Sequence, residues 1–293
     1  MLLRPSLILI AICVLSQVDG AQTPSANPAD LKLLPGYSST ETIGKDGKTA
    51  RLTRADGFTI TYLSSSPKNF YERSFKSGDD IVWLKYQELN GHRVRVASIK
   101  GGEMVVVVDD TQMLKATPEG LDHVADLLLT VSTLYPRKEE STPVTPAGVN
   151  PPGNMRLLAG YTYVRRQGKD SHVGSIIGEG GLTINHDIGR MAANYSRKYF
   201  PEYFEQLRKR YRNPDESVEA EIRSLEEKVS WRVNHEINDD DLMIAYLKDT
   251  TVIASFDRSS ANFVAKVDTF QELTDFLLTV LTYQPKPSSK LPK

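Results

Sequence analysis

The chain has 293 residues, of which 40% are hydrophobic and 25% are charged, so it is long enough for two ordinary soluble domains and is not composed like a disordered protein. Its 36 Lys and Arg residues balance 37 Asp and Glu residues, which gives a formal net charge of −1. Because binding to phosphates needs a concentrated basic surface, this balance gives no support to a nucleic-acid partner.

The first 20 residues have the pattern of a signal peptide. Arg4 supplies a positive start, residues 7 to 15 are apolar but too few to span a bilayer as an ordinary helix, and small or modest residues precede Ala21. We predict cleavage near Gly20, export to the periplasm or the extracellular space, and no transmembrane segment in the mature chain. Two alternatives stay open: an uncleaved membrane anchor, and a lipoprotein lipidated at Cys13.

Cys13 is the only cysteine, so the mature chain would contain no disulfides. Small secreted domains of eukaryotes usually depend on such cross-links, whereas an exported chain without them depends on core packing. The cysteine content therefore favours a bacterial exported protein.

The sequence contains an internal repeat. Residues 33 to 37 (LLPGY) return as residues 157 to 161 (LLAGY), and the same shift of 124 carries residues 57 to 60 onto residues 181 to 184. Further along, a shift of 148 aligns Trp83 with Trp231. A repeat of this length predicts a tandem duplication of one domain.

Segments rich in proline and small polar residues separate the two copies from each other and from the ends of the chain. The predicted layout is a signal peptide (1–20), a disordered leader (21–30), a first repeat domain (31–136), a Pro-rich linker (137–154), a second repeat domain (155–284) and a disordered tail (285–293).

Each half is expected to place its strands first and one helix last. Runs of β-branched and aromatic residues are separated by turns such as Asn90-Gly91, which favour tight antiparallel hairpins and hence a meander. The expected strands cover residues 58–62, 80–89, 93–99 and 103–108 in the first half, and 231–237, 242–247 and 251–256 in the second.

The closing helix of the first half covers residues 121 to 134, with Thr117 as its expected cap and Pro118 in its first turn. In the second half, Thr269 and Glu272 form the pattern of a capping box. Because each helix has one apolar face, we expect it to cover one face of its own sheet. The predicted fold is therefore α+β, with two copies of a two-layer domain.

The shift changes from 124 to 148 because the second half carries 24 extra residues, which read as an αα-hairpin over about residues 199 to 229. Residues 197 to 212 contain six basic and two acidic residues, and residues 213 to 228 contain two basic and six acidic residues. The charges of two such helices either neutralise each other, or the basic helix binds an anionic partner. The candidate interaction surface is Tyr203, Phe204, Arg208, Lys209 and Tyr211.

Candidate chemistry in the second half is sparse. His172, His186, His235 and Asp187 are weak candidates for a metal site, but their spacing matches no compact zinc motif, so we predict no metal and no cofactor. The mature chain contains no nucleophile in a recognisable catalytic context.

These patterns predict a non-catalytic, exported binding protein of the bacterial cell envelope, whose partner is an envelope protein, polymer or lipid. The alternative is an envelope-acting hydrolase, metal-dependent in one version, with its site near His186, Asp187 and His235. The sequence determines neither the ligand nor the oligomeric state.

Overall fold

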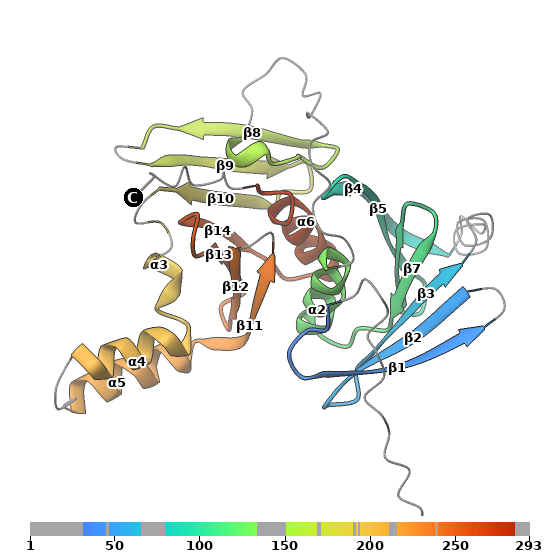
Figure 1. The fold of residues 1–293 in the computed structure, drawn as a ribbon. Helices are drawn as coiled ribbons and strands as arrows, with labels where there is room; N and C mark the ends of the chain where they lie inside the picture. The colour runs from blue at the N-terminus through green and yellow to red at the C-terminus, as the bar shows by residue number, and fades with distance from the viewer. Residues whose placement is uncertain are drawn as a thin grey trace, which may run out of the picture.

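The computed structural model describes residues 32–44, 47–65, 80–133, 151–168, 171–189, 192, 194–210, 216–237 and 240–284. These residues form two antiparallel sheets of seven strands each, together with several helices (Figure 1). The expectation of two similar α+β units is confirmed.

The first sheet has the strand order β1-β2-β3-β7-β6-β5-β4. Its strands are β1 Tyr37–Gly44, β2 Gly47–Arg54, β3 Thr59–Ser65, β4 Ile81–Leu89, β5 His92–Ile99, β6 Met104–Val108 and β7 Gln112–Ala116. The helix α2 Leu121–Ser132 follows it.

The second sheet has the matching order β8-β9-β10-β14-β13-β12-β11. Its strands are β8 Tyr161–Arg166, β9 His172–Gly178, β10 Thr183–Ile188, β11 Val229–Ile237, β12 Asp240–Leu247, β13 Thr251–Phe256 and β14 Ala261–Lys266. The helix α6 Phe270–Val280 follows it.

The two sheets repeat each other in detail. In both, the register shifts just before the tryptophan of the edge strand, at Trp83 in β4 and at Trp231 in β11. One expectation was wrong, because neither sheet is a single meander. After three strands the chain continues at the opposite edge and returns through four more, so that β3 pairs with β7 and β10 pairs with β14.

Turn and cap residues explain where several elements begin and end. Asn90 and Gly91 both have positive φ (53° and 84°), as a two-residue hairpin turn requires. The capping box of Thr269 and Glu272 is confirmed at the start of α6. The predicted cap Thr117 is wrong, because α2 begins after Gly120 and has no side-chain cap.

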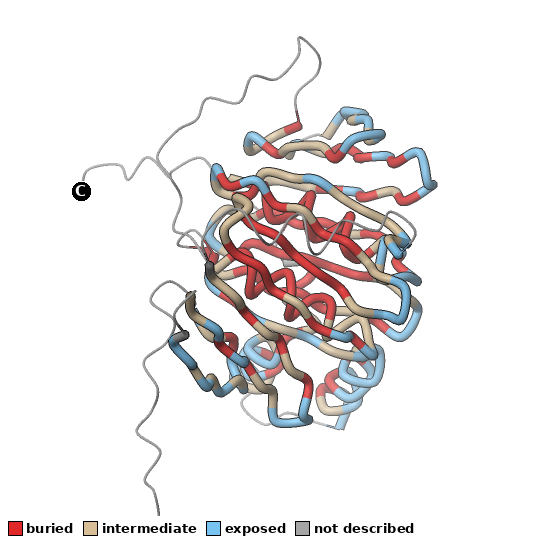
Figure 2. Tube along the Cα trace, turned by 90° about the vertical axis from the view of Figure 1, so that its right-hand side faces the viewer, coloured by how far each residue is buried: buried red, intermediate tan, exposed pale blue. Residues whose placement is uncertain are grey.

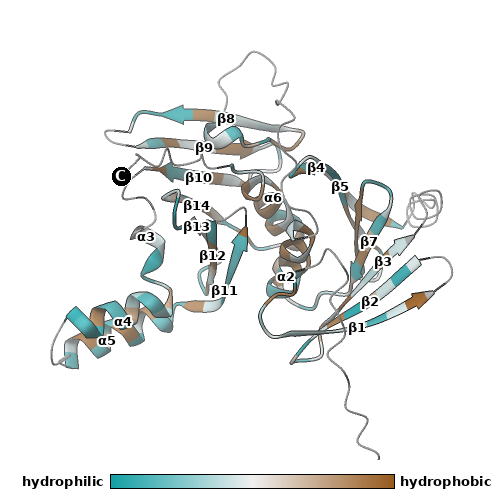
Figure 3. Ribbon diagram, in the orientation of Figure 1, coloured by the Kyte–Doolittle hydropathy of each residue, from teal (hydrophilic) through white to brown (hydrophobic). Residues whose placement is uncertain are grey.

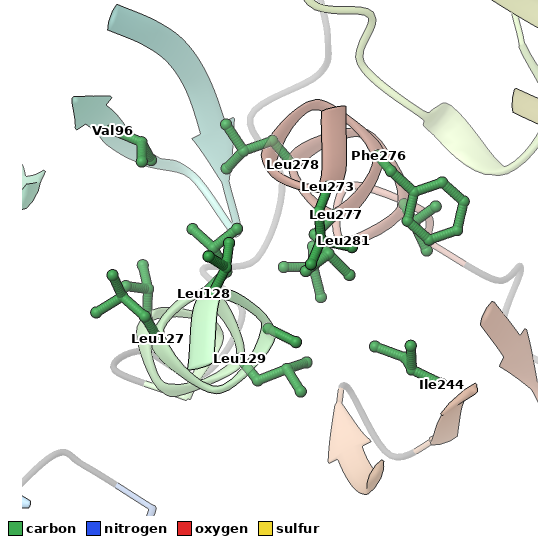
Figure 4. Packing of buried hydrophobic residues seen from close by; sticks show 14 of the residues in the cluster. Val96, Leu127, Leu128, Leu129, Ile244, Leu273, Phe276, Leu277, Leu278 and Leu281 are labelled. Carbon is green, nitrogen blue, oxygen red and sulfur yellow. The ribbon is translucent and has the colours of Figure 1, made fainter. Parts of the chain in front are cut away.

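Both closing helices lie between the two sheets and contact each other (Figure 1). Helix α2 contacts β7 of its own half and β11 of the other half, and α6 contacts β4 of the first half. Figure 4 shows leucines of α2 and α6 facing one another, with Val96 of β5 on one side and Ile244 of β12 on the other. The buried residues form one continuous core that includes both halves (Figure 2). We expected each helix to cover only its own sheet, so this shared core was not predicted.

Polar contacts between the halves are reciprocal. Lys32 Nζ lies 2.9 Å from Glu236 Oε2, and the counterparts of these residues, Arg156 and Glu88, also form an ion pair. A reciprocal pattern of this kind is what an interface with two-fold symmetry produces. The two halves therefore meet as two copies of one unit would in a symmetric dimer.

Of the predicted Pro-rich linker, only residues 151 to 154 are described. They include the 3-10 turn Pro152–Asn154, where Gly153 O accepts a hydrogen bond from Gln284 N. The signal peptide, the leader and the tail lie outside the described residues. Within the described part of the chain, every helix is too short or too polar to cross a bilayer.

Candidate functional site

Three helices lie between β10 and β11 in the second half: α3 Asn194–Arg197, α4 Pro201–Arg210 and α5 Glu216–Glu226. We call the described residues 194–210 and 216–226 the helical arm. Figure 1 shows α4 and α5 side by side, projecting from the end of the molecule where β11 lies. Both helices carry hydrophobic residues on the side where they meet, while most of the remaining surface is hydrophilic (Figure 3).

The helical arm has a small core of its own, separate from the main core. Because apolar residues recur three or four positions apart in both helices, each helix presents one apolar stripe to the other. Tyr199 and Tyr203 pack against this core. Its buried members are Phe204, Leu207, Val218, Ile222 and Leu225.

The start of the helical arm is fixed to the outer face of the second sheet. Phe200 is buried against Met243 and Ala245 of β12, with Tyr199 beside them. Arg232 of β11 donates a hydrogen bond to Tyr199 O (3.1 Å), and its guanidinium lies 5.9 Å from the centre of the Phe204 ring. These contacts attach the arm at its base.

A pocket of about 310 Å³ opens where the helical arm meets the sheet. Phe200, Tyr203 and Met243 give it an apolar side. Its polar side includes Arg197 and Asp257, which are joined by a hydrogen bond of 2.7 Å from Nε to Oδ1. This pocket therefore combines aromatic surface with a partly exposed ion pair.

The candidate interaction residues have different roles in the structure. Phe204 is 2% exposed, so it stabilises the helical arm instead of facing a partner. Tyr203 lines the pocket, and Lys209 is exposed. Arg208 of α4 donates to Glu219 of α5 (2.9 Å), which lowers the pKa of that carboxyl, and it also pairs with Glu205. One basic side chain is thus neutralised within the arm, while Tyr211 lies outside the described residues.

Three of the metal candidates, His172, His186 and Asp187, lie near one another on the paired strands β9 and β10, whereas His235 lies elsewhere in the second sheet. His172 is exposed on β9, at the rim of a shallow depression, and Asp187 and His186 belong to β10. His186 is buried beside Tyr163, and burial lowers its pKa to about 4. His235 lies on β11, which is separated from β10 by three strands.

His235 belongs to the junction of the two halves. It occupies the position of Gln87 in the first half, whose side chain donates to the main-chain oxygens of Arg156 and Leu278. His235 is 5% exposed, and burial, together with the nearby Lys32, lowers its pKa to about 4. Its environment suits a neutral side chain at an internal interface.

Among the described residues, only Asp56, Asp122 and His123 bring three potential metal-binding atoms within 4.8 Å of one another. The guanidinium of Arg54 already lies among them, because it donates to Asp56 Oδ2 (2.9 Å) and to Asp122 Oδ2 (2.7 Å). This positive group supplies the charge that a metal ion would otherwise bring.

Sequence reasoning missed a pair of buried carboxylates at the junction. Tyr37 donates to Asp126 Oδ2 (2.7 Å), and its counterpart Tyr161 donates to Asp275 Oδ2 (2.8 Å). Burial and the adjacent carboxylate raise the pKa of both tyrosines. The signal was present in the sequence, since both aspartates begin the similar helical stretches DLLLTV and DFLLTV.

Comparisons with protein-family models, with curated proteins and with solved structures found no match for this chain. Its function is therefore inferred from its own geometry.

Proposed function

We propose that the protein is a non-catalytic binding protein exported to the bacterial cell envelope, and that the helical arm makes its specific contact. The observation that carries this proposal is the pocket of about 310 Å³ at the base of the arm. It belongs to the part of the chain in which the second copy departs from the first.

The composition of this pocket favours a protein partner over a polymer or a lipid. Aromatic residues, methionine and arginine are enriched at the centres of protein interfaces, and Tyr203, Met243 and Arg197 all line the pocket. The arm also presents charges of both signs, with Lys209 and Arg210 at the end of α4 and glutamates on α5. Mixed charge of this kind suits a protein surface better than a uniformly anionic lipid surface.

The repeat shift changes from 124 to 148 between β10 and β11, so this segment is 24 residues longer than the corresponding segment of the first half. We take these residues to be an αα-hairpin inserted into the second copy. Since the shared residues build the common fold, an insertion found in one copy is the natural place for a contact particular to this protein.

Replacing residues 201 to 226 by a short Gly/Ser linker tests the proposal. The replacement retains Tyr199 and Phe200, so the outer face of the second sheet stays covered. The variant should fold but lose capture of its envelope partner in a quantitative binding assay with purified mature protein.

The matched control is Ile43→Ser, at a side chain that is 75% exposed on the first half. This variant should keep the partner. A deletion variant that captures the same partner as the intact protein would contradict the proposed role of the arm, and a loss of binding in Ile43→Ser would place the contact on the first half instead.

Export is tested separately by the N-terminus of the protein recovered from cells. Intact-mass measurement should give a chain that starts at Ala21. Recovery of the full chain in the membrane fraction would favour the anchor instead, and a lipid-modified Cys13 would favour the lipoprotein.

A further inference from the structure

A second cleft, of about 360 Å³, lies at the junction of the two halves. Lys85 of β4 comes from the first half, and the other lining residues belong to the start of β8, the β9–β10 turn and the first turns of α6. This cleft shares no lining residue with the pocket of the helical arm and is independent of the function proposed for that arm.

Asp275 is the buried carboxylate of this cleft, and its side chain is 6% exposed. Its Oδ2 accepts hydrogen bonds from Lys85 Nζ and from Tyr161 Oη, both 2.8 Å long. Its Oδ1 is buried and has no hydrogen-bond partner within the described residues. Leaving a carboxylate oxygen in this state is costly, so the observation points to a missing donor.

In the first half, the guanidinium of Arg54 lies beside Asp126, which is the counterpart of Asp275. Arg54 lies opposite Tyr37 across β1 and β2, as Gly178 lies opposite Tyr161 across β8 and β9. The second half therefore has glycine where the first half has an arginine. A Cβ atom at Gly178 would lie 2.5 Å from the Tyr161 ring, so a side chain there would not fit beside that ring.

The positions that surround the Arg54 guanidinium in the first half line the cleft in the second half, although only the Asp126 position keeps its residue type. Arg54 donates to Asp126 Oδ2 (2.8 Å), Asp122 Oδ2 (2.7 Å) and Asp56 Oδ2 (2.9 Å), and its guanidinium lies 5.8 Å from the centre of the Phe58 ring. The counterparts of these four residues all line the cleft, and they are Asp275, Gln271, Gly180 and Leu182. The first half thus holds its own guanidinium at this place, where the second half has the cleft and, on the matching carboxylate oxygen, Lys85 Nζ.

The charge of the cleft agrees with a cationic ligand. Glu179, Glu272 and Asp275 line it against the single cation Lys85. Glu272 already accepts the N–H groups of Asp268 and Thr269 at the start of α6, so this helix end is satisfied by the chain itself. Glu179 has no ion-pair partner within the described part of the chain.

We propose that this cleft binds a guanidinium group, either of a small free molecule or of an arginine side chain. The planar group presents several donors at once, which suits Asp275, Glu179 and the amide oxygen of Gln271 better than one ammonium does. Lys85 competes with the ligand for Asp275.

The test is a titration of the full mature chain with ethylguanidinium, followed by NMR at the main-chain amides of Gly160 and Gly180. Saturable shifts are expected with ethylguanidinium but not with ethylurea, a neutral molecule of similar shape. Equal responses to the two probes, or no saturable shift with either, would overturn the proposal.

Four variants sharpen the test. Lys85→Met should tighten ethylguanidinium binding by about tenfold, because it removes the competing cation. Asp275→Asn should weaken binding by at least about tenfold, and Glu179→Gln, in an exposed turn that should fold normally, should weaken it by about threefold. Glu103→Gln, at a half-buried residue just before β6 in the first half, is the charge-matched control and should leave affinity unchanged. Weaker ethylguanidinium binding in Lys85→Met would contradict the proposal, because it would show that Lys85 does not compete with the ligand for Asp275.

The two sources of the group are separated by further probes. A free small-molecule ligand predicts tighter binding of L-arginine than of arginine capped at both ends, and a peptide ligand predicts the reverse order. Binding of either probe supports the guanidinium site, and binding of neither would contradict it.

Discussion

Replacing His235 by the residue found at the matching position of the first half should make the protein less sensitive to acid. His235 is 5% exposed, and its pKa is lowered from 6.5 to about 4. The folded state therefore binds fewer protons than the unfolded state at pH values between about 4 and 6.5. The stabilisation from a neutral His235 is fully present above pH 6.5 and is lost as the pH falls toward 4.

The size of this effect follows from the two pKa values. With 6.5 in the unfolded and about 4 in the folded state, protonation linkage removes about 2 kcal/mol of unfolding free energy between pH 8 and pH 5. His235→Gln removes this titration. Because Gln87 makes two hydrogen bonds to main-chain oxygens at the matching position, glutamine is expected to fit there.

Urea unfolding at pH 8 and pH 5 measures the effect. The loss of unfolding free energy on acidification should be smaller in His235→Gln than in the unsubstituted protein by about 2 kcal/mol. Comparing the pH-dependent loss of unfolding free energy between the two proteins cancels the contribution of the carboxylates, because these groups titrate in both. His172→Gln, at an exposed histidine, is the matched control. Equal pH dependence in His235→Gln and the unsubstituted protein would refute the reasoning.

Three further predictions concern the buried carboxylates, the shared core and Arg54. Tyr37→Phe and Tyr161→Phe should each lower the unfolding free energy by about 1.5 to 3 kcal/mol in urea titrations, because each removes a hydrogen bond to a buried carboxylate; a loss under about 0.5 kcal/mol in both would contradict this. The two tryptophans report on different halves, so variants that retain only Trp83 or only Trp231 should show coincident fluorescence transitions, whereas separate midpoints would argue against one shared core. Arg54→Gly should lower the thermal midpoint, and ethylguanidinium should restore part of the loss where ethylurea does not. If the two compounds raised the thermal midpoint of Arg54→Gly equally, the charge of the Arg54 guanidinium would not be what stabilises the first half.

The strand and helix assignments that came from strong local signals were predicted well. The Asn90-Gly91 turn, the capping box at Thr269 and the closing helices all depend on residues close together in the chain. Strands β2, β7, β9, β10 and β14 were not among the expected strands. Strands β1 and β8 were also missed, because they are mostly polar edge strands without a clear alternation of hydrophobic residues.

The packing of the two halves against each other could not be predicted from local sequence patterns. An amphipathic helix indicates that one face is buried, but it does not say which element covers that face. The second sheet and the second helix are distant in sequence from α2, and their contacts with it depend on the packing of both halves.

The helices that carry the candidate residues were predicted better than the surroundings of the individual side chains. Periodicity indicated α4 and α5, but it could not distinguish Phe204, which is buried, from Tyr203, which reaches the pocket. The cleft between the halves was missed because its cation and its carboxylate, Lys85 and Asp275, are brought together only by the junction.

The most direct test of the proposed function is site-specific photo-crosslinking in living cells. A benzophenone amino acid in place of Tyr203, at the pocket of the helical arm, should give a discrete crosslinked product with an envelope protein. The same amino acid in place of Arg51, which is exposed on the first sheet, should give none. A product from the Arg51 position and none from the Tyr203 position would contradict the assignment of binding to the arm.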